Sequence, residues 1–306
     1  MEASSRSIGK LVKPLRDVGH ALAVARVGLA YWWRHARWPS LANPRTFTEW
    51  VQWRKLNDRD SARSMLTDKA FSKRLAGRLL GEQFVVPTLW EGEDLPEVAP
   101  WPMPFVVKAN HGCGQWSVVR DSADYRRVRH QSRQWLKRPY GAWLDEWHYR
   151  AAHRTILVEA YVGSGPILPL DYKIYVFGGR AVMVQVHEGR GENHHWRQYD
   201  RDWRPLSHHA GSARPPVSLT MMLDAAETLA GDADFLRVDF YEVGGQPLFG
   251  EFCLYPGSGL DPFDPVELDH WLGAFWSAAG EGRRVFPSWS EGIAEPEFST
   301  ASIAAE

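Results

Sequence analysis

Two acidic residues on neighbouring predicted strands are the strongest candidates for chemistry in this sequence. Asp239 and Glu251 lie in two short apolar stretches separated by a turn expected at residues 244–246, which places them opposite each other. Like charges in that position destabilise a sheet, whereas a divalent cation between them would gain the oxygen ligands that magnesium prefers. Arg237 shares the face of Asp239 and would point at phosphate oxygens. The pattern predicts a magnesium site for an anionic ligand; the alternative is a solvated hairpin whose carboxylates face water.

A lysine beside a glycine loop is the second candidate. Residues 105–119 read as two apolar strands joined by a loop that contains Gly112 and Gly114, with Lys108 near its base. Glycine lets backbone N–H groups approach a phosphate closely. No Gly-Lys-Ser/Thr follows and the next element is a strand, so this is not a Walker loop. His111 could contact a phosphate or make a structural hydrogen bond, and a glycine hairpin with a chance lysine also fits.

Three further charged residues sit in predicted strands. Glu159 interrupts an apolar strand and needs a hydrogen-bonding partner; either a nucleotide edge or a salt bridge would provide one. Asp171 and Lys173 project from one face of another strand and could meet a ribose hydroxyl and a phosphate.

The elements that must position these residues are mostly short strands. Thr46 with Glu49 predicts a capped helix start, and the spacing of apolar residues predicts further helices over 68–80, 124–136 and 219–230. Strands are expected at 84–86, 105–109, 116–120, 156–162, 172–177, 181–187, 236–243 and 248–255. Many strands joined by hairpins favour an α+β body built from antiparallel sheets over a doubly wound parallel sheet.

The order of the motifs resembles an ATP-grasp enzyme and, more narrowly, the teichuronopeptide-biosynthesis (TupA-like) type, over roughly residues 43–276. The blocks that carry the resemblance are 43–47 (NPRTF), 105–112 (FVVKANHG), 171–173 (DYK), 249–251 (FGE) and 255–259 (YPGSG). The resemblance implies an ATP-grasp fold, in which two α+β lobes with antiparallel sheets clasp a nucleotide, plus an N-terminal helical segment. We expect a basic helical extension at 1–42, the ATP-grasp domain at 43–280 with lobes at about 84–165 and 166–280, and a tail at 281–306.

The same resemblance implies roles for individual residues. Arg237 and Lys108 are expected to be catalytic, Arg237 by stabilising charge in the acyl-phosphate and tetrahedral species. Glu159 is expected on the adenine side and Asp171 at the ribose. The implied nucleotide contacts are Lys69, Lys108, His111, Gly112, Gly114, Glu159, Asp171 and Lys173; the implied magnesium ligands are Asp239 and Glu251; the implied substrate loop is Gly257, Ser258 and Gly259.

One position departs from the family pattern. ATP-grasp ligases typically have asparagine two residues after the metal-binding glutamate, and here that residue is Cys253. A neutral thiol is a poor magnesium ligand, so the second metal could be weak, replaced by water or absent.

The expected function is an ATP- and Mg²⁺-dependent carboxylate–amine ligase that forms an acyl phosphate. The resemblance implies the biosynthesis of a cell-surface polysaccharide or a polyglutamate-type polymer as its setting. The alternatives are a transferase or kinase (glycosyltransferase-like) of the same polysaccharide pathway, and a nucleotide-binding scaffold without turnover.

Composition limits the other possibilities. The chain has 306 residues, is 44% hydrophobic and carries a formal net charge of −1, so nothing draws it to nucleic acid. Its two cysteines suit a reduced cytoplasmic compartment. The apolar run at 21–33 is too short to span a bilayer, but the basic segment 6–37 could lie on the inner face of an anionic membrane. Docking on the enzyme body through Tyr31, Trp32 and Trp33 is the other interpretation.

Four histidines occur in the polar and aromatic segment 190–216. The adjacent pairs His194/His195 and His208/His209 would point apart on an extended chain, which makes them poor zinc ligands. We expect this segment to be a long loop beside the site that faces the substrate, with Trp196 and Trp203 available to stack on a ring.

Overall fold

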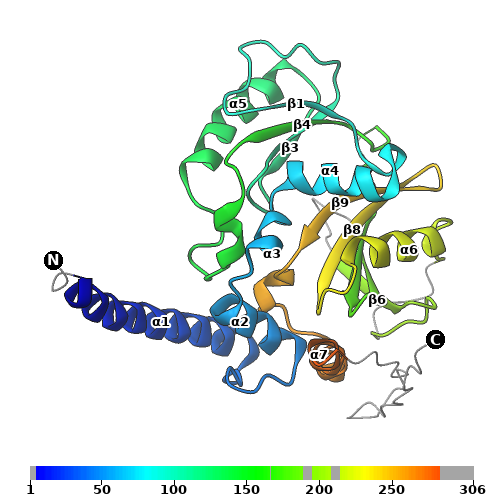
Figure 1. Cartoon of the computed structure of the whole chain (residues 1–306). Helices are drawn as coiled ribbons and strands as arrows, with labels where there is room; N and C mark the ends of the chain where they lie inside the picture. The colour runs from blue at the N-terminus through cyan, green and yellow to red at the C-terminus, as the bar shows by residue number, and fades with distance from the viewer. Residues whose placement is uncertain (1–4, 166, 189–194, 208–213, 283–306) are drawn as a thin grey trace.

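Two antiparallel sheets form the framework of the molecule (Figure 1). The computed structural model describes residues 5–165, 167–188, 195–207 and 214–282. The smaller sheet has the order β1-β4-β2-β3 and the larger β7-β6-β5-β8-β9. The strands are β1 Thr88–Gly92, β2 Phe105–Ala109, β3 Trp116–Val119, β4 Ile156–Ala160, β5 Asp171–Phe177, β6 Arg180–Glu188, β7 His195–Asp200, β8 Leu236–Val243 and β9 Gln246–Cys253.

Helices cover the outer surfaces of the sheets and join them (Figure 1). They are α1 Ser5–His35, α2 Phe47–Asn57, α3 Ser61–Met65, α4 Lys69–Leu80, α5 Ser122–Lys137, α6 Leu219–Ala230 and α7 Glu267–Gly280, with short 3-10 turns η1 Glu82–Phe84, η2 Trp147–Ala151 and η3 Pro256–Gly259. The expected α+β fold of two antiparallel sheets is confirmed. The expected lobes at 84–165 and 166–280 each contain one of these sheets, and their boundaries stay a prediction.

Alternation along the strands divides each sheet into an apolar and a polar face. In the smaller sheet, Phe105, Val107 and Val158 are fully buried in a core with Tyr125 of α5. Their sequence neighbours point the opposite way, because side chains alternate across a strand. Lys108 and Glu159 therefore lie on the face that looks toward the larger sheet.

The larger sheet is packed on both sides. Helix α6 contacts β5, β6 and β8 on one face. On the other face, one end is filled by aromatic rings that include Phe47 of α2, Phe177 of β5 and Trp276 of α7. The charged residues of β5, β8 and β9 project from the remainder of that face.

The start of α2 agrees with its local sequence. Thr46 accepts a hydrogen bond from the Glu49 backbone, and the Glu49 side chain accepts one from the Thr46 backbone, so the predicted capping box is present. Asp269 of α7 accepts further hydrogen bonds from the backbone N–H and the hydroxyl of Thr48, at 2.8 and 2.6 Å. The start of α2 is thereby attached to α7.

Helix α4 lies between the two sheets (Figure 1). Asp68 caps it by accepting a hydrogen bond from the Phe71 backbone. Lys69 and Lys73 are four residues apart and so share one face of the helix. Because of this position, the helix can supply one ammonium group to each sheet: Lys69 to the larger and Lys73 to the smaller.

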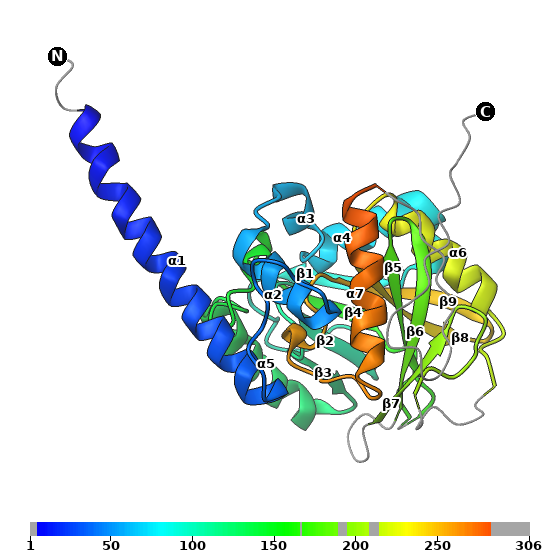
Figure 2. The same ribbon diagram turned by 90° about the horizontal axis from the view of Figure 1, so that it is seen from below.

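Helix α1 projects away from the rest of the molecule (Figure 2). Near its C-terminal end it docks through Val27 and Tyr31, which are 1% and 0% exposed. Trp33 is 75% exposed and Trp32 47%, so only Tyr31 of the three aromatic residues expected to dock is buried. In the described part of the chain, no helix is long and apolar enough to cross a membrane.

Two local predictions need correction. Residues 84–86 are not a strand: the chain makes the turn η1 there, and Val85 forms only an isolated bridge with Phe249. The segment 190–216 is not one long loop, because β7 pairs with β6 inside it; His194, His208 and His209 lie outside the described residues. Among the residues that are described, no three His, Cys, Asp or Glu side chains form a metal-binding group.

The hairpin between β8 and β9 has the expected pairing of Asp239 with Glu251, but its turn differs from the one we expected. The turn has two residues, Gly244 and Gly245, both at positive φ, instead of the three that we expected. A two-residue turn suits this backbone twist and requires glycine-like residues. A bulge at Gly250 then shifts the pairing by one residue, so Asp239 lies opposite Glu251 as predicted.

Candidate active site

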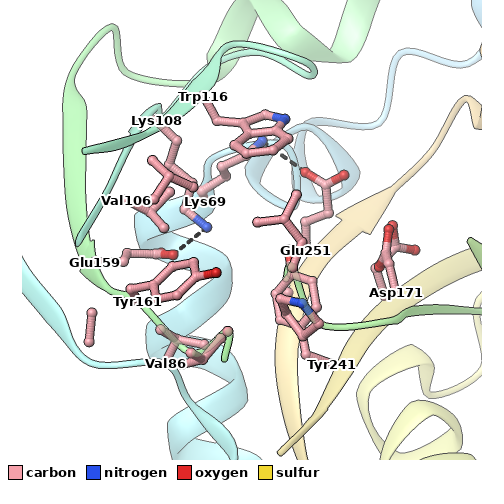
Figure 3. Close-up of a pocket in the computed structure, with 18 of the residues that line it drawn as sticks. Lys69, Val86, Val106, Lys108, Trp116, Glu159, Tyr161, Asp171, Tyr241 and Glu251 are labelled. Atoms are coloured by element: carbon pink, nitrogen blue, oxygen red, sulfur yellow. Dashed lines mark ion pairs between the residues drawn. The ribbon is translucent and has the colours of Figure 1, made fainter. Parts of the chain in front are cut away.

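A cavity of about 430 Å³ lies between the two sheets (Figure 3). Most of the nucleotide-site residues expected from the sequence line it. They are Lys69, Lys108, Gly112, Gly114, Glu159, Asp171, Asp239 and Glu251. Residues more than 180 positions apart in the chain therefore converge on one space.

Lys69 joins the two sides of this cavity. Its ammonium lies 3.0 Å from Glu251 on β9 and donates a 2.9 Å hydrogen bond to the Gly112 carbonyl in the glycine loop. Burial alone would lower the pKa of Lys69, but the adjacent Glu251 carboxylate outweighs it and the pKa is raised. Lys69 therefore stays protonated and can meet an anion.

Glu159 is held by two lysines rather than one. Its carboxylate oxygens lie 2.6 Å from the ammonium of Lys108 (Figure 3) and 2.7 Å from that of Lys73. Burial would raise the pKa of Glu159, but Lys108 and Lys73 outweigh it and hold the pKa below its usual value. The salt bridge that the sequence left open as an alternative is therefore present on this strand.

Lys73 is a site residue that we did not predict. It reaches Glu159 and the Thr88 hydroxyl from α4, and it is 5% exposed. Its spacing of four residues from Lys69 was a usable signal, because residues i and i+4 lie on one helix face.

A chain of alternating charges runs along β5 and β8. Lys173 lies 2.5 Å from Asp171 and 2.6 Å from Asp239. Arg237 binds both oxygens of Asp239, at 2.7 Å each. Burial would raise the pKa of Asp239, but Arg237 and then Lys173 outweigh it, so this carboxylate stays ionised.

Two of the residues that we predicted to bind the nucleotide or to act in catalysis lie outside the main cavity. Lys173 and Arg237 do not line the main cavity, whereas Asp171 and Asp239 do. Arg237 instead lines a second cavity of about 70 Å³ on the other side of Asp239. The Arg237–Asp239 pair therefore separates the two spaces.

Asp239 and Glu251 fit a magnesium ion as donors. They are register partners on β8 and β9, both line the cavity, and the charge of Asp239 acts to raise the pKa of Glu251. Magnesium is commonly bound by one or two carboxylates together with substrate phosphates and water. Glu251 is the more accessible ligand, since 25% of its side chain is exposed.

The glycine loop is open on its cavity side. Gly114 has a φ of +70° and nothing lies within 4 Å of a Cβ built on it. A Cβ on Gly112 would lie 2.9 Å from the Tyr140 ring, so the chain there is closely packed on one side. His111 does not line the cavity: it is 2% exposed and its Nε2 lies 3.1 Å from the Trp135 carbonyl oxygen. The geometry gives His111 a structural hydrogen bond rather than the expected phosphate contact.

Hydrogen bonds from helix α2 hold the loop at 257–259. Gly257 and Ser258 are at φ +51° and +57°, and a left-handed conformation is unusual for serine. The Ser258 carbonyl accepts hydrogen bonds from Lys55 at 2.6 Å and Gln52 at 3.0 Å. Gly257 lines the second cavity next to Arg237, whereas Ser258 and Gly259 line neither of the two cavities.

Helix α1 contacts the same loop. Arg34 donates a 3.1 Å hydrogen bond to the Leu260 carbonyl, and Nε2 of His35 lies 3.2 Å from the Gly259 carbonyl oxygen. The extension is thus in direct contact with the segment that resembles a substrate loop.

Cys253 faces the arginine rather than the cavity. It is the register partner of Arg237, is 5% exposed and does not line the main cavity. Burial raises the pKa of its thiol to about 12, so the thiol is neutral near pH 7 and offers no anionic ligand.

Comparison with known proteins identifies the family. The family model described as TupA-like ATPgrasp matches residues 49–277. No curated protein matches. Among solved structures, the chain is similar to a D-alanine--D-alanine ligase from Bacillus anthracis complexed with ATP, with 14% identity, 71% of this chain and 68% of that chain covered and a TM-score of 0.44. It is also similar to the VanG D-Ala:D-Ser ligase from Enterococcus faecalis, with 12% identity, 72% and 62% covered and a TM-score of 0.45.

The family-model match extends over three quarters of the chain and defines its class, the ATP-grasp proteins. Within that class, the chain belongs to the TupA-like ATP-grasp family.

Proposed function

We propose that the protein is an ATP-dependent carboxylate–amine ligase that works through an acyl phosphate. The observation that carries the proposal is the arrangement of Lys69, Lys108 and the Asp239/Glu251 pair around one cavity. Cations that line the cavity, beside carboxylates suited to magnesium, are the groups that phosphoryl transfer requires.

In this mechanism Lys69 and Lys108 bind the phosphates, and Arg237 stabilises the charge that moves toward the acyl group. A substrate carboxylate oxygen attacks the γ-phosphorus, the bond from that phosphorus to the β–γ bridging oxygen breaks, and ADP leaves. The amine then attacks the carbonyl carbon, the bond from carbon to the phosphate oxygen breaks, and the amine loses a proton. Magnesium held by Asp239 and Glu251 would neutralise phosphate charge.

The nucleotide base is assigned to the segment that follows β4. Tyr161, Val162 and Gly163 line the cavity after Glu159, and they connect the strands of the smaller sheet to those of the larger. Aromatic and apolar side chains of this kind suit an adenine ring. Asp171, at the start of β5, takes the ribose side.

The test is ATP-dependent stabilisation combined with product analysis. Addition of MgATP should raise the melting temperature of the wild type, and Lys108→Met should abolish that rise. A ligase forms ADP only with both a carboxylate and an amine, a kinase or transferase needs one acceptor, and a scaffold gains stability without forming ADP. Retained stabilisation in both Lys108→Met and Asp239→Ala would contradict the placement of the site.

We place this activity in the synthesis of a cell-surface polysaccharide or polyglutamate-type polymer, next to the inner face of a membrane. Val18, Leu22, Leu29 and Trp33 on α1 are 58%, 62%, 55% and 75% exposed, and their spacing puts them on one side of the helix. The segment around them is rich in lysine and arginine, which suits anionic lipid. Cosedimentation with anionic vesicles, absent with neutral ones and lost in Leu22→Asn/Leu29→Asn, would support this location; equal recovery without vesicles would contradict it.

A further inference from the structure

Glu159 is an anion shared by two lysines that approach it from different elements. Its Oε1 lies 2.7 Å from the ammonium of Lys73 on α4, and its Oε2 lies 2.6 Å from the ammonium of Lys108 on β2. Glu159 and Lys108 line the main cavity, whereas Lys73 does not. One carboxylate oxygen is therefore held from outside the cavity and the other by a residue of the cavity wall.

Lys73 is fixed more firmly than Lys108. It is 5% exposed, and besides Glu159 it binds the Thr88 hydroxyl at 2.6 Å. Thr88 of β1 is the register partner of Glu159 on β4, so Lys73 is attached at two neighbouring points of the smaller sheet. The Lys108 side chain is 13% exposed and stands one residue before the end of β2, close to the glycine loop. Of the two lysines, Lys108 is the one that can move toward a ligand.

The charges of these three groups do not cancel. Two ammonium groups share one carboxylate, so a positive charge is in excess within the cluster. Without Lys73, the other two residues would form a neutral pair, and a phosphate could gain Lys108 only by leaving the buried Glu159 carboxylate unpaired. Breaking a buried ion pair in this way is strongly unfavourable. Lys73 removes that cost, because Glu159 keeps one cation when the other is drawn to the phosphate.

The charged form of Lys73 depends in turn on Glu159. Burial lowers the pKa of Lys73, Glu159 opposes this and Lys108 adds to it, so that the pKa lies below its ordinary value. A neutral amide in place of the Glu159 carboxylate would remove the group that favours the ammonium. Glu159 is therefore the second residue to change in a test of this cluster.

We propose that Lys73 is a positioning residue for nucleotide binding, which keeps Glu159 paired and thereby releases the Lys108 ammonium to the phosphates of ATP. The inference rests on the nucleotide site of the proposed function and adds a residue outside the cavity on which the affinity of that site depends. Lys69, one turn earlier on α4, lines the cavity itself. The helix thus carries one lysine that meets the ligand and one that acts through another side chain.

The experiment measures the dissociation constant of MgATP by isothermal titration calorimetry with the full-length protein. In Lys73→Met the affinity should fall about thirtyfold, because the transfer of Lys108 to phosphate now leaves a buried carboxylate unpaired. Lys73→Arg keeps the charge and should recover most of the affinity, whereas Lys73→Gln keeps a hydrogen-bond donor without the charge and should not. Arg78 is exposed on the same helix, so Arg78→Met is the matched control and should bind MgATP as the wild type does.

A second background separates positioning from a general effect on folding. In Glu159→Gln, Lys108 has no carboxylate to leave, so adding Lys73→Met to that variant should not weaken MgATP binding further. A lysine that only supports the fold would weaken binding in both backgrounds. Thermal unfolding without ATP shows which variants are folded, and Lys73→Gln takes the place of Lys73→Met in this comparison if Lys73→Met does not fold.

The outcomes separate this inference from the function on which it rests. Unchanged affinity in folded Lys73→Met, equal weakening in both backgrounds, or equal affinities of Lys73→Arg and Lys73→Gln would overturn the role of Lys73 and leave the nucleotide site intact. A wild-type protein that does not bind MgATP would overturn the nucleotide site itself, and this inference with it.

Discussion

Lys69 and Glu251 form an ion pair of 3.0 Å that joins helix α4 to strand β9 beside the candidate nucleotide cavity. The same ammonium binds the Gly112 carbonyl of the glycine loop. One side chain thus links the helix, the larger sheet and the loop. Because Glu251 is also the accessible candidate metal ligand, the ion pair occupies the position where magnesium and phosphate would bind together.

Replacing Lys69 should affect stability and nucleotide binding together. Lys69→Met leaves the largely buried Glu251 carboxylate without its cation, and breaking such a pair is strongly destabilising. We expect a lower melting temperature and loss of the rise with MgATP, measured by thermal unfolding. Lys137 is exposed on α5, so Lys137→Met serves as the matched control. A Lys69→Met protein that MgATP still stabilises would show that this lysine does not bind phosphate.

Removing Glu159 should lower the free energy of unfolding more than removing one of the two lysines that bind it. Glu159→Gln places two ammonium groups beside a neutral amide, and the loss of the buried charge should lower the free energy of unfolding by about 3 kcal/mol. Lys73→Met removes one of the cations and leaves the carboxylate paired with Lys108, so its loss should be smaller. Urea unfolding of both variants and the double variant measures the coupling. Equal and additive losses would contradict a shared network.

Cys253 should control the metal requirement. Cys253→Asn supplies an amide oxygen two residues after Glu251, and oxygen is the donor that magnesium prefers. We expect half-maximal MgATP stabilisation at a lower magnesium concentration than in the wild type, measured at fixed ATP. Cys113→Asn is a poor control because that thiol contacts Tyr149; Cys253→Ser, which keeps the size and adds a weaker oxygen donor, is the better comparison. An identical magnesium dependence in all three proteins would remove Cys253 from the metal site.

Lys55 should give a stability change at alkaline pH. Burial lowers its pKa to about 8, whereas in the unfolded chain it is about 10.4. Between these values the unfolded state binds more protons, so this group makes stability rise with pH. The difference in unfolding free energy between wild type and Lys55→Met should therefore grow in favour of the wild type from pH 8 to 10. Parallel curves over that range would show that Lys55 does not titrate there.

Local sequence predicted those parts of the structure that depend on few neighbours. The cap of α2 depends on Thr46 and Glu49 alone, and the positions of α5 and α6 follow from apolar spacing within each segment. The pairing of Asp239 with Glu251 was predicted correctly, although the two-residue turn and the bulge at Gly250 together produce the register that a three-residue loop was expected to give.

What remained unpredicted depends on elements that are distant in sequence. Lys73 is a site residue only because α4 packs where its side chain reaches β4. The burial of Gln198 depends on β7, which pairs with β6 within a segment whose polar composition resembles a loop. His111 follows a strand that ends at the cavity, but its ring is turned toward the end of α5, and no feature of its immediate neighbours indicates that direction.

The contact between α1 and residues 259–260 has a practical consequence for work with this protein. The hydrogen bond from Arg34 and the close approach of His35 hold a chain segment that contains a left-handed serine. Truncating the protein before residue 40 to obtain a more compact species would remove those supports along with the projecting helix. Kinetic data from such a shortened protein would then report a relaxed loop at residues 257–260 rather than the native one.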